Sequence, residues 1–263
     1  MNKAALTLSD LTTGYATKGN RATISVGINA TLYAGELTCL LGPNGAGKST
    51  LLRTLCGFQP QLDGRIEMDG RDLSDYTPRE LSTRIGVVLT DRVDVRGMRV
   101  DELVAMGRSP YTGFWGGLQK QDHEAVADAI KKVGIQALAT REVNTLSDGE
   151  RQKAMIAKAL AQQTPIILLD EPTAFLDFPS KVEMMLLLRR LAHETGKAIF
   201  LSTHDLDMAL QTADRLWLLS KEEGLRIGTP RELATSDEIN RFFPSTNMTF
   251  DVETMHFIIT KDA

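Results

Sequence analysis

Eight consecutive residues, Gly42 to Ser49, carry the strongest chemical signal in the chain. They read Gly-Pro-Asn-Gly-Ala-Gly-Lys-Ser and fit the phosphate-binding pattern G-x-x-x-x-G-K-[ST], between an apolar run and a helix-compatible segment. Glycines let such a loop curl until successive backbone N–H groups face inward, which suits a polyphosphate. Lys48 is expected to neutralise the β- and γ-phosphates, and the Ser49 hydroxyl to give one oxygen to Mg²⁺. We therefore predict a nucleoside triphosphate site.

A pair of adjacent carboxylates provides the second chemical signal. Asp170 and Glu171 follow the apolar run 166–169, and ligands of an open α/β sheet bind at the carboxyl ends of its strands. We predict that Asp170 holds Mg²⁺ through water and that Glu171 polarises the water that attacks the terminal phosphate. The alternative is that the pair caps the following helix. The phosphate loop upstream favours the catalytic interpretation.

These motifs lie in a pattern that predicts an α/β fold with a mainly parallel sheet. From Leu37 onward apolar runs alternate with helical patterns. Several runs are apolar throughout, as strands covered on both faces must be. The predicted strands are 37–41, 85–89, 166–169 and 198–202. Earlier β-runs at 5–8 and 23–32, broken by glycines, predict an antiparallel β subdomain.

A helical insertion and a C-terminal segment complete the predicted organisation. Helical signals replace strands between about 96 and 163, where an amphipathic pattern over 122–133 ends at Gly134. Ser/Thr-x-x-Glu pairs predict helix starts at 77–80, 147–150 and 229–232. Further β-runs are predicted at 215–220, 225–227, 248–251 and 256–260. The predicted organisation is one domain, 1–263, with a catalytic core at about 1–95 and 164–228, a helical subdomain at about 96–163 and a C-terminal extension at 229–263.

Composition and charge exclude several other classes of protein. The 263 residues are 42% hydrophobic and 24% charged, which excludes a disordered or collagen-like chain. A net charge of −4 gives no basic field, so nucleic acid is not expected as a partner. The longest uncharged stretch, 22–35, is too short and polar to span a bilayer, and the start lacks the pattern of a secretory signal. We therefore expect a cytoplasmic protein in which Cys39 and Cys56 are buried thiols.

Together the motifs resemble those of the ATP-binding cassette ATPases, over about Leu6 to Gly228. The resemblance implies a P-loop NTPase core. A pentapeptide resembling the family's signature consists of Leu146, Ser147, Asp148, Gly149 and Glu150. In the family this signature acts on the nucleotide held by a partner subunit, which implies a homodimer. From the residues alone, Ser147 predicts a helix N-terminus that can bind an anion, and a simple helix cap is the alternative. Asp148 departs from the family, which most often has Gly there.

The resemblance also implies roles for residues outside these motifs. Tyr15 stands where the family stacks an aromatic ring on adenine, although a tyrosine resting on the sheet is the alternative. Asp177 lies in the loop that touches the opposing site. His204 follows the predicted strand 198–202 and stands where the family contacts the γ-phosphate and orients Glu171. The predicted ATP-binding residues are Tyr15, Gly42, Pro43, Asn44, Gly45, Ala46, Gly47, Lys48, Ser49 and Thr50, and the predicted catalytic residues are Lys48, Glu171 and His204.

Thr90 is the main departure from the family pattern. After the run 85–89 the family usually has a Gln that reaches Mg²⁺ and the attacking water, whereas this chain has Thr. Thr has an oxygen but a shorter reach. Either Thr90 ligates the ion through water, or Asp91 or Arg92 relays between the site and a partner instead. The predicted metal ligands are Ser49, Asp170 and Thr90, and the predicted cofactors are ATP and Mg²⁺.

The segment 98–118 bears on what the ATPase drives. Its run 106–111, Met-Gly-Arg-Ser-Pro-Tyr, resembles cassettes of bacterial importers for iron chelates, haem and cobalamin. Tyr111, Phe114 and Trp115 predict either an exposed aromatic contact surface or the roof of the subdomain core. The resemblance implies an ATP-hydrolysing subunit that is peripheral on the cytoplasmic side of the inner membrane. It would lie below permease subunits, to which a substrate-binding protein delivers the cargo.

Two other functions remain open from the sequence. One is an ATPase without a membrane partner, such as those serving iron–sulfur-cluster assembly. The other is a nucleotide-gated interaction module that does not catalyse, for which Thr90 and Asp148 are the motivation. Phosphate release separates the module from the ATPases, and co-purification with a membrane subunit separates the two ATPases.

Overall fold

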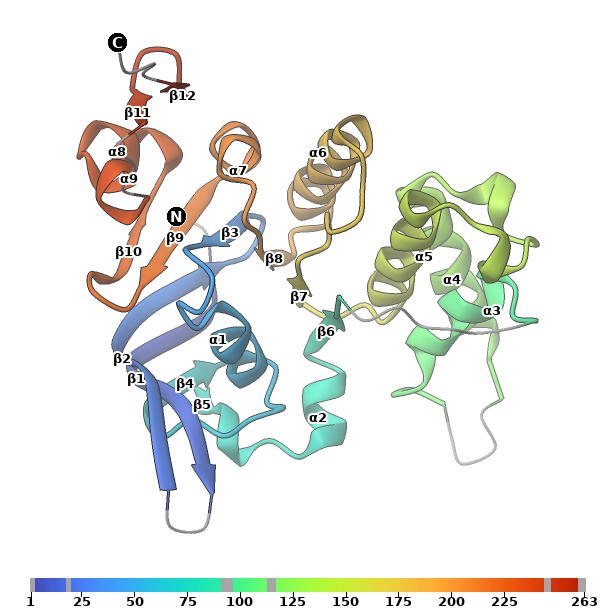
Figure 1. Ribbon diagram of the computed structural model, residues 1–263. Coiled ribbons are helices and arrows are strands. Elements are labelled where there is room, and N and C mark those ends of the chain that lie inside the picture. Colours follow the sequence, from blue (N-terminus) through green and yellow to red (C-terminus); the bar gives the residue numbers. More distant parts are fainter. Residues whose placement is uncertain (1–2, 18–19, 91–96, 113–116, 244–246, 260–263) are drawn as a thin grey trace.

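A six-stranded sheet forms the centre of the computed structural model, which describes residues 3–17, 20–90, 97–112, 117–243 and 247–259 (Figure 1). Its strand order is β10-β9-β3-β8-β7-β6. The bounds are β3 (Leu37–Leu41), β6 (Ile85–Val88), β7 (Ile166–Asp170), β8 (Ala198–Ser202), β9 (Arg215–Ser220) and β10 (Gly224–Gly228). Neighbouring strands from β9 to β6 run parallel, and β10 is antiparallel to β9. The predicted mainly parallel sheet is confirmed.

Both faces of this sheet are buried. Successive side chains of a strand point to opposite faces. Cys39 and Ile167 therefore join one core, shared with helices, whereas Leu40 and Leu168 join another, shared with the N-terminal strands. This double covering explains why the strands are apolar without alternation. Cys39 and Cys56 are free and buried, as expected, and burial raises the pKa of the Cys56 thiol to about 12.

The N-terminal strands form a separate four-stranded sheet of order β2-β1-β4-β5. Its strands are β1 (Ala4–Thr17), β2 (Asn20–Tyr33), β4 (Asp63–Met68) and β5 (Arg71–Asp72). Every pairing in it is antiparallel, which confirms the expected arrangement. β1 and β2 run beyond the predicted ranges because their exposed ends are held by pairing with each other rather than by an apolar pattern. β4 escaped prediction because it buries only Ile66 and Met68.

Local signals predict several ends of the described α-helices. They are α1 (Lys48–Leu55), α2 (Pro78–Ser82), α3 (Val100–Ala105), α4 (Lys120–Val133), α5 (Asp148–Ala161), α6 (Phe178–Thr195), α7 (Leu206–Thr212), α8 (Pro230–Thr235) and α9 (Glu238–Phe242). Reciprocal caps between a Thr or Ser and the Glu three residues later confirm the predicted starts at Thr77, Ser147 and Thr229. α4 ends at Gly134, whose φ of +79° is the expected left-handed cap.

Helices α3, α4 and α5 lie together at the β6 side of the sheet, away from the β1–β2 hairpin (Figure 1). In the described part of 97–163 the regular elements are helices, apart from an isolated bridge between Arg99 and Glu142. This agrees with the predicted helical insertion. The division of the chain into subdomains, with the boundaries given above, stays a prediction.

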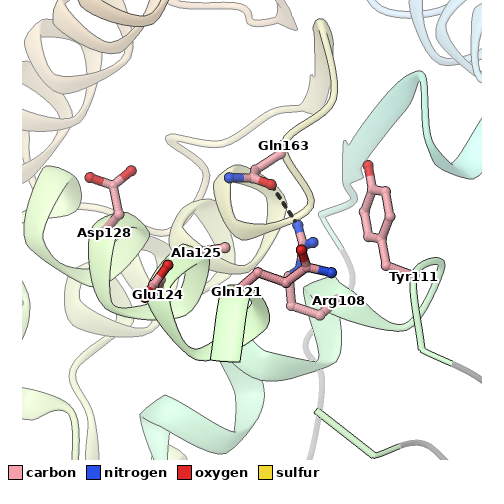
Figure 2. Close-up of a pocket in the computed structure, with 7 residues that line it drawn as sticks. All are labelled: Arg108, Tyr111, Gln121, Glu124, Ala125, Asp128 and Gln163. Carbon is pink, nitrogen blue, oxygen red and sulfur yellow. Dashed lines mark hydrogen bonds between the residues drawn. The ribbon is translucent and has the colours of Figure 1, made fainter. Parts of the chain in front are cut away.

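A buried arginine joins the helices of this region. Arg108 is 4% exposed and donates to Asp122 Oδ1 at 2.9 Å, to the Ala161 carbonyl at 2.8 Å and to Gln163 Oε1 at 2.9 Å. Figure 2 shows the guanidinium against Gln163 and beside the Tyr111 ring, whose centroid lies 4.1 Å away. The Gln119 N–H and then Arg108 hold the pKa of Asp122 below its ordinary value. Arg108 thus fixes the start of α4 to the end of α5.

This cluster bears on the predicted aromatic surface. Tyr111 is 40% exposed, and its hydroxyl donates to the Gln162 carbonyl at 2.9 Å. The other two aromatic residues, Phe114 and Trp115, lie outside the described residues. Whether the three form a contact surface or a roof stays open.

The chain ends in α8, α9 and the antiparallel pair β11 (Met248–Asp251) and β12 (His256–Ile259). Both strands confirm predicted β-runs, although Thr260 lies outside the described residues. Phe250 is buried, and its ring centroid lies 5.3 Å from that of Phe257. Within the ranges that the structure describes, no helix combines the length and the apolarity that crossing a bilayer requires.

Candidate functional site

The predicted phosphate loop connects β3 to α1, as the motif requires. Gly47 precedes α1 with a φ of +102°, and a Cβ there would lie 2.5 Å from Ile24 Cγ2, so a side chain is excluded both by backbone conformation and by space. Gly45 also has a positive φ, of +80°. No described side chain caps α1, so its first N–H groups are available to an anion. Ser49 is exposed at this end of the helix.

Lys48 lies buried under the loop that it is expected to serve. Its Nζ donates to the carbonyl of Gly42 at 2.6 Å and to that of Pro43 at 3.2 Å. Burial lowers the pKa of Lys48 from its ordinary value, and the nearby carboxylates of Glu171 and Asp170 oppose that shift. The ammonium group, the loop and both predicted carboxylates therefore belong to one electrostatic site.

The carboxyl ends of β7 and β8 bring the predicted catalytic residues together. Glu171 Oε1 lies 3.6 Å from His204 Nδ1. Asp170 Oδ1 accepts a hydrogen bond from Ser202 Oγ at 2.6 Å. Ser202 is 1% exposed and was not predicted as a site residue. The parallel pairing of β7 with β8, which places it beside Asp170, is the signal that could have found it.

Tyr15 lies on β1 at the edge of this site. Its hydroxyl is 3.1 Å from Thr50 Oγ1 in the first turn of α1, and the side chain is 45% exposed. The contact brings the ring to the phosphate loop, and the exposure leaves ring surface free for a nucleobase. Stacking on adenine stays a prediction.

Thr90 follows β6 and points to the same sheet edge. Its hydroxyl donates to the main-chain carbonyl of Asp170 at 2.8 Å. Its predicted part in holding Mg²⁺ stays a prediction. Asp91 and Arg92, the alternative relays, lie outside the described residues.

The signature-like segment and the predicted dimer loop both form helix N-termini. Ser147 Oγ accepts the Glu150 N–H at 3.3 Å at the start of α5. Asp177 Oδ1 accepts the Ser180 N–H at 3.1 Å at the start of α6, and its bonds to Ser180 hold its pKa below the ordinary value. Asp148 lies 3.8 Å from Arg151, which compensates its charge. The simple cap is therefore present at both places, and action on a second copy stays a prediction.

The signature and the phosphate loop occupy different parts of one chain. In Figure 1, α5 and α1 stand on opposite sides of β6. In the described chain the signature-like segment therefore does not lie beside the phosphate loop, and its action on a second copy stays a prediction.

A phosphate loop between a strand and a helix, with carboxylates at the end of a neighbouring parallel strand, defines a P-loop nucleoside triphosphatase. A family profile described as ABC transporter matches residues 26–174, more than half of the chain. The chain belongs to the ABC transporter family, in which it is an ATP-binding and ATP-hydrolysing subunit.

Relatives cover nearly the whole chain. The ferric enterobactin transport ATP-binding protein FepC of Escherichia coli K12 is 37% identical over 94% of this chain and 90% of its own length. The iron(3+)-hydroxamate import ATP-binding protein FhuC of Bacillus subtilis 168 is 32% identical over 91% and 87%. A solved dimeric structure of the bacterial ABC transporter cassette MJ0796 superposes with a TM-score of 0.72 at 27% identity, over 86% of this chain and 98% of that one. These similarities confirm the predicted family and fold.

Proposed function

We propose that this chain powers an importer of iron chelates, haem or cobalamin. Two relatives support this cargo class: FepC is a ferric enterobactin transport protein and FhuC an iron(3+)-hydroxamate import protein. They also favour a transport role over an ATPase without a membrane partner. The chain is proposed to act as a homodimer, peripheral on the cytoplasmic side of the inner membrane. It works with permease subunits, to which a substrate-binding protein delivers the cargo.

An apolar groove between the sheet and the helical region supports the proposal that the chain binds a membrane partner. The groove has a volume of about 690 Å³, and its lining includes Phe58, Tyr76, Leu81, Met106 and Pro110. Phe58 is 62% exposed and Met106 47% exposed, so apolar surface at the groove is open to a partner. We assign the groove to a short apolar helix of the permease, because apolar side chains line it and an amphipathic helix binds to a partner by placing its apolar face in such a groove.

The geometry supports a division of roles in hydrolysis. The loop N–H groups and Lys48 bind the polyphosphate, and Tyr15 carries the adenine. Glu171 accepts a proton from the attacking water, and His204 orients that carboxylate and contacts the γ-phosphate. Ser147 and Asp177 of the second copy complete the site. Binding of ATP closes the dimer, and hydrolysis lets it reopen and move the permease.

The oxygen donors at the sheet edge fit Mg²⁺. Ser49 and Asp170 would supply a hydroxyl and a carboxylate, whereas the Thr90 hydroxyl is directed at the Asp170 carbonyl. Among the described residues no three His, Cys, Asp or Glu side chains gather as a protein-only metal centre would need. Mg²⁺ takes few protein ligands and completes its shell with phosphates and water. When bound, the ion neutralises charge on the β- and γ-phosphates.

Co-purification with the permease tests this function. Wild-type chain expressed with the permease from its own gene cluster should co-purify in detergent, and Phe58→Glu should lose the permease but retain ATP binding. Leu186→Glu, an equally apolar residue 51% exposed on α6 outside the groove, is the matched control and should retain the permease. If wild type retains ATP binding but never co-purifies, the ATPase without a membrane partner becomes the better function. If Phe58→Glu co-purifies as wild type does, the groove is not the docking site.

A further inference from the structure

One peptide group, between Asp170 and Glu171, is held from both sides at the end of β7. Its carbonyl accepts the Thr90 hydroxyl at 2.8 Å, and its N–H donates to Ser202 Oγ at 3.0 Å. The two side chains come from different strands, since Thr90 follows β6 and Ser202 ends β8. Both polar groups of this peptide are therefore satisfied by side chains, and its plane cannot rotate without breaking one of the bonds.

Ser202 connects the two carboxylate residues through a single hydroxyl. It donates to Asp170 Oδ1 at 2.6 Å while it accepts the Glu171 N–H. Ser202 is also the register partner of Asp170 in the pairing of β7 with β8, and it is 1% exposed. A hydroxyl so buried has no water to replace either contact. Its position is therefore determined by the sheet.

Glu171 has an unfavourable backbone conformation, and the hydrogen bonds to the preceding peptide help to maintain it. Its φ is +44°, which residues other than glycine seldom adopt. The carbonyl of Glu171 accepts the Ala174 N–H at 3.0 Å, so the residue is held on its C-terminal side as well. In this conformation its carboxylate lies 3.6 Å from His204 Nδ1. Loss of a contact to the preceding peptide would let the backbone relax and move that carboxylate.

We propose that Thr90 and Ser202 are positioning residues, which hold the Asp170–Glu171 peptide so that the Glu171 carboxylate meets the attacking water. The inference rests on the proposed role of Glu171 as the base. It also gives Thr90 a role that suits its short side chain. The hydroxyl contacts the backbone of the neighbouring strand and does not need to extend to the phosphates. The hydrogen of that hydroxyl is directed at the Asp170 carbonyl.

The first test removes each hydroxyl with little change in shape. Thr90→Val and Ser202→Ala should lower kcat by about 10- to 100-fold, because a small displacement of a catalytic group has effects of that size. KM for ATP should change less than about 3-fold, since the phosphate loop is untouched. Thr90→Ser, which keeps the hydroxyl, should recover most of kcat. Ser220→Ala is the matched control, because Ser220 ends β9, is 7% exposed and accepts the Glu223 N–H.

The second test separates positioning from a general loss of structure. Thr90→Val should lower kcat in the wild-type background but should not lower the residual rate of Glu171→Gln, because a residue that acts through Glu171 has no effect once the carboxylate is gone. An equal loss in both backgrounds overturns the inference. A wild-type kcat in Thr90→Val also overturns it. The inference is overturned as well if Thr90→Val needs a higher Mg²⁺ concentration for half-maximal activity and excess Mg²⁺ restores its kcat, because Thr90 would then be a ligand of the metal. Wild-type turnover in Glu171→Gln would also overturn the inference, because Glu171 would then not be the base, whereas the importer function would still be tested separately by co-purification with the permease.

Discussion

Glu171 and His204 meet at the carboxyl ends of β7 and β8, where Glu171 Oε1 lies 3.6 Å from His204 Nδ1. The two strands pair in parallel, with Asp170 opposite Ser202, so the sheet register sets this approach. The His204 side chain is 55% exposed and that of Glu171 33% exposed, so water and phosphate can reach both groups from the same side of the sheet edge. This pair is the centre of the proposed hydrolytic site.

Replacing His204 should impair chemistry more than binding. His204→Ala removes the group expected to orient Glu171 and contact the γ-phosphate, so kcat should fall by roughly 100-fold or more while KM for ATP stays within about 3-fold. Steady-state phosphate release measures both constants. His193→Ala is the control, because His193 lies in α6 against Asp214 and away from this edge. An unchanged kcat in His204→Ala would remove His204 from the mechanism.

Tyr15 distinguishes nucleobase stacking from packing on the sheet. Tyr15→Ala should weaken ATP binding by roughly 10-fold or more, because stacking of a base on an aromatic ring has that order of effect. Tyr15→Phe should retain affinity, since it keeps the ring and loses only the contact to Thr50. Isothermal titration with a non-hydrolysable ATP analogue measures the effect. Equal affinity in all three proteins, with a lower melting temperature for Tyr15→Ala, would support the packing role instead.

Arg108 should be important for stability because it satisfies several buried acceptors at once. Arg108→Ala leaves Asp122 without its cation and should lower the melting temperature by roughly 5–10 °C. Arg108→Lys should recover little, since an ammonium cannot match the directed contacts of a guanidinium. Lys132→Ala, which breaks the exposed i,i+4 pair with Asp128, is the control and should lower the melting temperature by less than about 2 °C. A similar small change in Arg108→Ala would contradict the assigned role.

Lys197 should make stability depend on pH. Burial lowers the pKa of Lys197 from 10.5 to about 8, and its Nζ donates to the Thr164 carbonyl. Below about pH 8 both the folded and the unfolded states carry the charge, and the folded state bears the full cost of burying it, at most about 3 kcal/mol. Between about 8 and 10.5 the unfolded state binds more protons, so stability attributable to Lys197 rises with pH.

Substitution of Lys197 isolates that contribution. Lys197→Met should raise the free energy of unfolding at pH 7. It should also reduce the increase in the free energy of unfolding between pH 8 and 10.5, as measured by urea denaturation across that range. Lys120→Met is the control, because the Lys120 side chain is 92% exposed and should have no such effect. A pH profile that is identical in wild type and Lys197→Met would show that the buried amine is not the cause.

Local patterns were sufficient to predict much of the fold. The loop at 42–49, the reciprocal caps and the unalternating strands each depend on residues close in sequence, and the structure contains all of them. β4, most of β1 and the ends of β2 were missed because they are stabilised by pairing with one another and show little apolar periodicity.

The parts of the site that were missed depend on the order of strands. The place of Ser202 beside Asp170 follows from the pairing of β7 with β8, and the contact from Thr90 follows from the position of β6 beside β7. The contacts of Arg108 with Ala161 and Gln163 likewise join residues more than fifty positions apart. No window of neighbouring residues contains that information.

The most direct measurement of the central claim is the molar mass of Glu171→Gln in saturating Mg²⁺-ATP, by light scattering after size exclusion. If the phosphate loop of one copy and the signature of another enclose ATP, this variant should bind ATP, retain only a small residual rate of turnover and form a stable dimer of twice the 28.9 kDa chain. Adding Ser147→Arg should leave ATP bound to monomers. A monomeric Glu171→Gln at full ATP occupancy, or a dimer that Ser147→Arg does not weaken, would contradict the account.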